Sequence, residues 1–219
     1  PLFPEDFSNK TFGGLYLAKG REQTMRAYHG TVHSGLRILK PFCNPHSNLA
    51  YPCVYLSTNK ALASIYIWNR PYKWMTFEIS QDGIPVYDES FENGLYEFYH
   101  GVKGVIYSCE GEFHVDERTA ISCAVVSRRP VPVSSEDIVE DAYERILQYE
   151  AVGLLRINHY DTLSHEQRRR DKSMVLGAIH RLGLLMGEHP LSDFVREKFP
   201  ALWNEALLEM TVKKQEDDG

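Results

Sequence analysis

Features that would mark a membrane protein are scarce in this sequence of 219 residues. No apolar run approaches the roughly 20 residues that a helix needs to cross a bilayer. The N-terminus also lacks the basic-then-apolar order of a secretion signal. We therefore expect a protein that makes no membrane contact and lies in the cytoplasm.

Excess positive charge is lacking as well. The chain has 24 Lys and Arg residues against 30 Asp and Glu residues, a formal net charge of −6. A protein without a global positive field is not expected to coat nucleic acid non-specifically, although a local basic pocket is compatible with this charge.

Paired cysteines are the third absence. The four cysteines, Cys43, Cys53, Cys109 and Cys123, form no Cys-x-x-Cys motif, which is typical of a reduced cytoplasmic protein. Cys43, His46 and Cys53 could in principle ligate zinc, but a fourth ligand at suitable spacing is missing. No metal site is predicted.

The pattern along the chain predicts an α+β fold. Few long helices alternate with strands in the first part, so a doubly wound parallel sheet is not expected. We divide the chain into a lead-in segment (1–25), a strand-rich core (26–133) and a helical extension (134–219). Strands are predicted at 26–29, 53–56, 74–79, 84–87, 105–107, 120–126, 131–133 and 154–157, with a hairpin at 110–118. Helices are predicted at 60–68, 91–99, 134–153, from Ser164 and from Pro200.

The stretch from Tyr55 to Tyr66 predicts a strand, a corner and a helix in close succession. A strand at 53–56 is followed by the polar corner Ser-Thr-Asn at 57–59, which can cap a helix. The helix at 60–68 places Leu62 and Tyr66 on one face, and Pro71 is expected to end it.

Together with His29, this unit resembles the ADP-ribosyltransferase superfamily, on the diphtheria-toxin and poly(ADP-ribose) polymerase side. In that family a strand ends in His-Gly, here His29-Gly30. A later strand carries a tyrosine, here Tyr55, and the next helix carries a second one, here Tyr66. The interval 66 − 55 = 11 matches the family pattern, and the resemblance covers roughly residues 26 to 133.

The resemblance implies two small antiparallel sheets facing each other around a cleft that binds NAD as co-substrate. His29 would hydrogen-bond the adenosine ribose, and the backbone of Gly30 would receive the nicotinamide amide, with close approach allowed by the missing β-carbon. Tyr66 would stack on the nicotinamide ring, Tyr55 would form the wall beneath it, and Thr31 would donate to a ribose or amide group. The catalytic role falls to His29, Tyr55 and a carboxylate.

That carboxylate is the element that does not match. The family has a glutamate near the start of a late strand, but the strand expected at 121–127 contains no Asp or Glu. Glu110, Glu112 and Glu117 lie on the preceding hairpin, and Glu112 is our first choice because Phe113 could anchor it. A solvated hairpin glutamate is the ordinary alternative for each.

The sequence thus predicts an NAD-dependent mono-ADP-ribosyltransferase whose acceptor is a protein, a nucleic acid or a small molecule. The alternative is a non-catalytic module of the same fold that binds NAD or ADP-ribose. Two further rivals are a small-molecule modifier whose acceptor supplies the missing base and an RNA-phosphate transferase, which would need basic residues around the cleft. His46 could touch the pyrophosphate, although a surface histidine is the commoner role.

A purely structural interpretation also stands. His29 could cap a strand while Tyr55 and Tyr66 pack in the core. The tripeptide Tyr-His-Gly occurs a second time at 99–101, which shows that it is not specific. Only the first copy precedes the two tyrosines in the order that the family requires.

Overall fold

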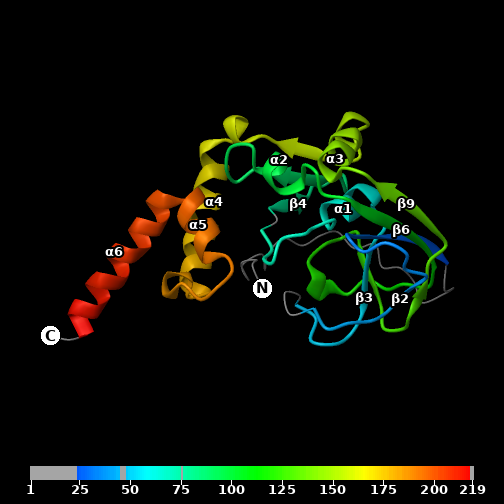
Figure 1. Ribbon diagram of the computed structural model, residues 1–219, viewed down its shortest axis with the longest axis horizontal. Helices are drawn as coiled ribbons and strands as arrows, with labels where there is room; N and C mark the ends of the chain where they lie inside the picture. The colour runs from blue at the N-terminus through cyan, green and yellow to red at the C-terminus, as the bar shows by residue number, and fades with distance from the viewer. Residues whose placement is uncertain (1–23, 45–47, 75, 218–219) are drawn as a thin grey trace.

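The computed structural model describes residues 24–44, 48–74 and 76–217, and their arrangement is α+β as predicted (Figure 1). Within these described residues, ten strands form three sheets. The strands are β1 (Met25–Thr31), β2 (Ile38–Leu39), β3 (Val54–Ser57), β4 (Phe77–Ile79), β5 (Pro85–Asp88), β6 (Gly104–Gly111), β7 (Ala124–Ser127), β8 (Val131–Pro132), β9 (Ser135–Val139) and β10 (Arg156–Asn158). Residues 1–23 of the expected lead-in lie outside the described part, and Met25 already belongs to β1.

Helices surround the sheets and extend to one side of them. Figure 1 shows α2 and α3 beside the sheets, whereas α4, α5 and α6 gather at the opposite end from β2 and β3, with α6 pointing away from the body. No described helix is long and apolar enough to cross a membrane. The helices are α1 (Lys60–Ile65), α2 (Gly94–Tyr99), α3 (Ala142–Ala151), α4 (His165–Arg181), α5 (Ser192–Lys198) and α6 (Pro200–Asp217), with short 3-10 turns at Glu117–Thr119, Tyr160–Thr162 and Leu184–Met186.

The largest sheet has five strands in the order β7-β3-β1-β6-β9, and all its neighbours are antiparallel. Its centre is buried on both faces, which explains the continuous apolar run Val105-Ile106-Tyr107 in β6. Val105 and Tyr107 pack with Ala27 on one face, while Ile106 joins the larger core cluster that contains residues of α1, α3 and α4.

The second sheet differs from the expected one. Its order is β10-β5-β4, with β4 antiparallel to β5 but β10 parallel to it. The prediction of two antiparallel sheets is therefore wrong for this one, because the chain returns through α3 and crosses over before β10 pairs with β5. A two-stranded sheet of β2 and β8 completes the set.

The unit formed by β3 and α1 follows its local sequence signals. Asn59 caps α1, since its Oδ1 accepts from the Leu62 N–H at 2.9 Å. The helix ends at Ile65, earlier than the position that Pro71 would impose. Its last turn closes by bonds from Tyr66 N–H to the Ala63 carbonyl and from Ile67 N–H to the Ser64 carbonyl, a tightened end that leaves Tyr66 as the C-cap.

Other boundaries move where tertiary pairing overrides local pattern. The helix expected at 134–153 is wrong in its first part: residues Ser135–Val139 form β9, paired with β6, and α3 begins only after its N-cap, Asp141. The five-stranded sheet therefore continues past residue 133, the expected end of the core, into the expected helical extension (134–219). The expected hairpin at 110–118 is also different, because β6 runs to Gly111 and His114 then bridges Val126.

The C-terminal helices begin largely where the sequence indicates. Ser164 and Gln167 form the predicted capping box at α4, with bonds of 2.9 and 3.2 Å, and α6 starts at Pro200. Helix α5 was not anticipated. Its Phe194 packs against the rings of Trp74 and Phe91, so this short helix is stabilised by burial rather than by its own seven residues.

Candidate functional site

The site lies where β1 and β3 separate. These two strands share one register pair in the described chain, Tyr28 opposite Ser57, whereas β1 pairs with β6 at seven positions. Continuing the antiparallel register would set Gly30 opposite Tyr55, and that pair is not part of the described ladder. Instead, the His29 Nδ1–H donates to the Tyr55 carbonyl at 2.8 Å and joins the two strands through a side chain.

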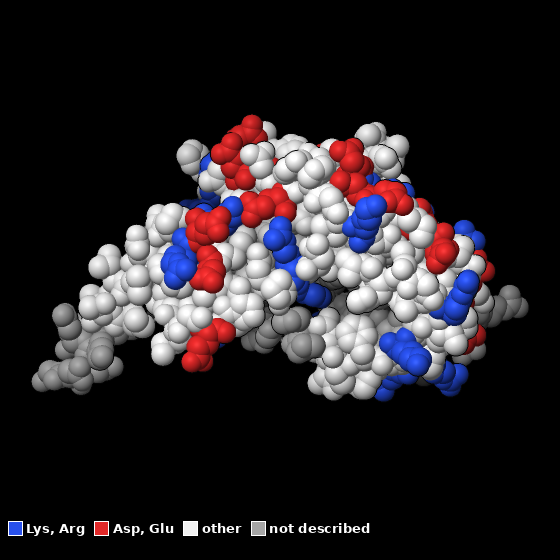
Figure 2. All heavy atoms as spheres, viewed as in Figure 1, with Lys and Arg blue, Asp and Glu red and all other residues white. Residues whose placement is uncertain are grey.

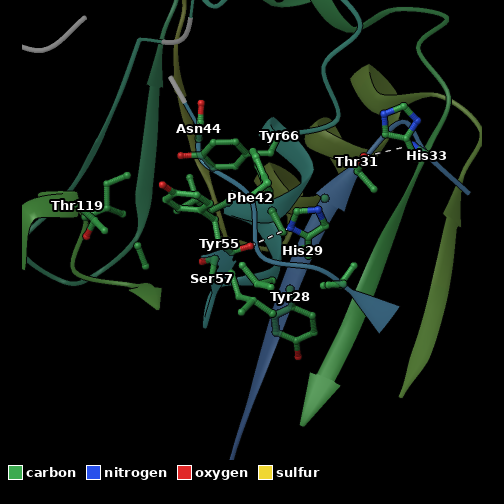
Figure 3. A pocket seen from close by; sticks show the side chains of 18 of the residues that line it. Tyr28, His29, Thr31, His33, Phe42, Asn44, Tyr55, Ser57, Tyr66 and Thr119 are labelled. Carbon is green, nitrogen blue, oxygen red and sulfur yellow. Dashed lines mark hydrogen bonds between the residues drawn. The ribbon is translucent and has the colours of Figure 1, made fainter. Parts of the chain in front are cut away.

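A cavity of about 690 Å³ opens at this separation. Its wall includes all five residues predicted to hold the dinucleotide: His29, Gly30, Thr31, Tyr55 and Tyr66. Figure 3 shows Tyr55 and Tyr66 on one side of His29, and Tyr28 directed the other way. Residues far apart in the sequence therefore converge on one concavity, as the sequence predicted.

The contacts of His29 define its protonation. A carbonyl oxygen can only accept, so Nδ1 carries the proton, and in the neutral ring Nε2 is a hydrogen-bond acceptor. Burial lowers the pKa of His29, an effect that the bond to the Tyr55 carbonyl partly offsets. His29 is thus neutral at physiological pH, and its Nε2 can accept a hydrogen bond from a hydroxyl group.

Aromatic rings form one wall of the cavity. Tyr66 meets Phe77 edge to face with centroids 6.2 Å apart, and Tyr55 meets Phe42 in the same way at 5.8 Å. Burial raises the pKa of Tyr66 well above its ordinary value, so its phenol stays neutral. An electron-rich neutral ring in such a wall suits a flat or cationic heterocycle.

Gly30 is required for the packing of α1 against β1, a role that was not predicted from the sequence. A β-carbon built on Gly30 would lie 1.7 Å from the Ala63 carbonyl oxygen. The end of α1 therefore packs directly on the backbone of β1. The missing side chain admits the helix, and ligand access is not needed to explain this glycine.

The structure does not bring the predicted carboxylate to the cavity. Glu112 is exposed and is not part of the wall. Glu110 pairs with Arg26 at 2.6 Å, and Glu117 lies exposed in a 3-10 turn. The wall beside β3 is instead formed by Ile121 and Ala124, and no Asp or Glu occurs among the described lining residues.

The wall also contains cations that were not among the predicted site residues. Lys73 is half-buried, with Nζ 5.7 Å from the centre of the Tyr66 ring, and burial lowers its pKa. No carboxylate pairs with Lys73 within the described part of the chain. Lys40 and His33 also line the cavity, both exposed. The only sequence signal for Lys73 is a lone cation in the aromatic run Tyr72-Lys73-Trp74.

Metal binding gains no support from the described residues, where no group of three or more His, Cys, Asp or Glu side chains could hold an ion. Cys53 is buried and Cys43 exposed, while His46 lies outside the described residues. Comparisons with protein families, with curated proteins and with solved structures give no match.

Proposed function

We propose that the protein is an NAD-dependent mono-ADP-ribosyltransferase and that the cavity between β1 and β3 binds the dinucleotide. The observation that carries this proposal is the convergence of His29, Gly30, Tyr55 and Tyr66 on one cavity. These are the positions of the His-Gly and two-tyrosine pattern, and they come from two strands and the end of a helix.

The lining suits the parts of NAD. The acceptor nitrogen of His29 would receive a ribose hydroxyl. The face of Tyr66 would stack on the cationic nicotinamide ring. Lys73 would supply positive charge for the pyrophosphate, in a wall without acidic groups among its described residues.

The reaction needs little covalent help from the protein. The bond between the ribose anomeric carbon and the nicotinamide nitrogen breaks, and its electron pair leaves with nicotinamide. The carbon becomes cation-like and is then attacked by the acceptor, which releases its proton. The protein holds the reactants in place and surrounds the departing group.

The carboxylate that usually stabilises such a cation is missing from the described wall, where Ile121 and Ala124 stand beside β3. We therefore propose single transfer in which the acceptor brings its own base or negative charge. The same observation favours a second function, a non-catalytic module that binds NAD or ADP-ribose.

Nicotinamide release and calorimetric binding of NAD test both functions. Release by the wild type that falls at least about tenfold in Tyr66→Ala and in His29→Ala supports the transferase. Tyr66→Phe keeps the ring and should retain binding. His100→Ala is the matched control, because His100 belongs to the second Tyr-His-Gly copy, is half-exposed and pairs with Asp141.

Binding of NAD without nicotinamide release, with or without candidate acceptors, would establish the binding module. If NAD neither binds nor raises the melting temperature, both functions fail. Equal loss of function in His100→Ala and His29→Ala would point to general instability and would remove the assignment to this cavity.

A further inference from the structure

The cavity opens beside an edge of the large sheet that carries positive charge. At this edge Phe42 bridges Cys53, immediately before β3, and Val54 pairs with Ser127, the last residue of β7. Arg128 therefore follows directly beside Cys53. The pair Leu39 and Val131 of the small sheet brings Lys40 to the same end as Arg129.

Three cations at this edge have no acidic partner within the described part of the chain: Lys40, Arg128 and Arg129, all exposed. Arg118 nearby is different, because Asp116 neutralises it at 2.6 Å. Figure 2 shows basic side chains gathered over the region of β2 and β3, whereas acidic ones lie mainly along the opposite margin of this face. Exposed positive charge is thus concentrated here in a chain whose net charge is −6.

Aromatic rings are interleaved with these cations. The guanidinium of Arg128 lies 4.0 Å from the centre of the Tyr51 ring, and that of Arg118 lies 5.3 Å from it. Phe42, two residues after Lys40, is 48% exposed although it lines the cavity. An exposed ring beside cations that have no acidic partner among the described residues, at a cavity mouth, offers a stacking face together with phosphate contacts.

We propose that this basic edge (Lys40, Phe42, Arg128 and Arg129) binds single-stranded nucleic acid, which is the acceptor class of the proposed transfer. The cations would contact successive phosphates while a base stacks on Phe42, the combination by which proteins bind single strands. A duplex keeps its bases stacked inside and cannot use the ring. An acidic protein would use the cations but would not need the exposed phenyl group. The role as acceptor rests on the proposed function, whereas the binding surface does not.

Fluorescence anisotropy with labelled strands of about 12 nucleotides tests the surface. The probes are a DNA strand, an RNA strand, the corresponding duplex and a polyglutamate peptide, each titrated with the full chain without NAD. We expect a single strand to bind about tenfold more tightly than the duplex or the peptide. Arg128→Ala/Arg129→Ala should weaken this binding about tenfold and reduce its salt slope by about one to one and a half.

The ring and the charges can be tested separately. Phe42→Ala should weaken strand binding at least about fivefold, while Phe42→Tyr should retain it. Arg169→Ala is the matched control, since Arg169 is an exposed arginine on α4, and it should change nothing. Thermal unfolding of each variant confirms that it is folded.

Three results would overturn the inference: no strand binding by the wild type, tighter binding of polyglutamate or duplex than of the strand, or equal effects of Arg128→Ala/Arg129→Ala and Arg169→Ala. NAD affinity is measured on the wild type in a separate titration. A protein that binds the strand but not NAD keeps this surface and loses the transferase proposal. A protein that binds NAD but not the strand loses this surface, and the transferase proposal stands.

Discussion

Two regions of this molecule differ in the partners that they provide for buried charged side chains. At the junction of β5 and α4, Asp88 and Glu89 are 7% and 6% exposed, and each is bonded. Asn158 donates to Asp88 at 2.7 Å, and Arg170 approaches it at 3.5 Å. Glu89 accepts from the Leu95 N–H at 3.0 Å. Such satisfied carboxylates are structural, because their desolvation is offset by fixed donors.

At the cavity between β1 and β3, the charges have the other sign and lack such partners among the residues that the structure describes. Lys73 is half-buried beside Tyr66 without an acidic group in the described part of the wall. A charge that is partly desolvated and unpaired costs free energy unless a ligand completes it. Asp88 and Glu89 thus have fixed donors, whereas Lys73 has no acidic partner in the described part of the chain. Four substitutions of decreasing expected effect test this difference.

Gly30→Ala should cost at least about 3 kcal/mol of unfolding free energy, because its β-carbon would overlap the Ala63 carbonyl oxygen. Urea unfolding measures the loss. Gly177→Ala in α4 is the control: its β-carbon would meet only the end of Arg181 at 4.0 Å, and alanine favours a helix by about 1 kcal/mol. A Gly30→Ala protein as stable as wild type would contradict the close packing of α1 on β1.

Glu89→Ala should cost about 2 to 3 kcal/mol, since the backbone N–H groups of Leu95 and Tyr160 would lose their acceptor. Glu92→Ala, three residues away and exposed, should stay within about 0.5 kcal/mol of wild type. Chemical denaturation of both variants gives the difference. If Glu89→Ala changed NAD affinity without changing stability, the separation between the two regions would fail.

Asp171→Asn should stabilise the protein at alkaline pH. Burial, and next the nearby Asp88 carboxylate, raise the pKa of Asp171 to about 6 from 3.8, and its Oδ2 has no hydrogen-bond donor in the described chain. The folded state therefore holds a proton that the unfolded chain releases between these values, so stability falls as pH rises from about 4 to 6.

Asp171→Asn removes the loss of stability that ionisation of the Asp171 carboxyl group causes. We expect a gain of about 1 to 2 kcal/mol at about pH 8 and almost none at about pH 4. Unfolding titrations across this range measure the gain. A gain that is independent of pH would show that the carboxyl group is not the cause.

Lys73→Met should act in opposite directions on stability and on binding. Removing a half-buried unpaired charge should raise the stability of the ligand-free protein by up to about 1 kcal/mol. NAD affinity should fall about fivefold to tenfold with the loss of the cation. Thermal unfolding and calorimetry measure the two effects, and a variant that is both less stable and unaltered in NAD affinity would place Lys73 with the structural charges.

Local signals predicted their own elements well. Asn59 caps α1 and Ser164 caps α4, because each bond closes within three residues. The failure at 135–139 has an equally physical cause. Ile138, Val139, Ala142 and Ile146 are spaced as on a helix, but pairing with β6 draws the first two into a strand, and the sequence contains no signal for a partner some 30 residues away.

For the candidate site, the order of His29, Tyr55 and Tyr66 and the polarity of the turn between β3 and α1 could be predicted from the sequence alone. Tertiary structure decided what those residues can do. It separated β1 from β3, brought Lys73 under the ring of Tyr66 and left Ile121 and Ala124 where a carboxylate was expected. Caps and turns depend on bonds between neighbours in the chain, whereas a cavity depends on which strands pair, and that is set by burial on both faces of the whole sheet.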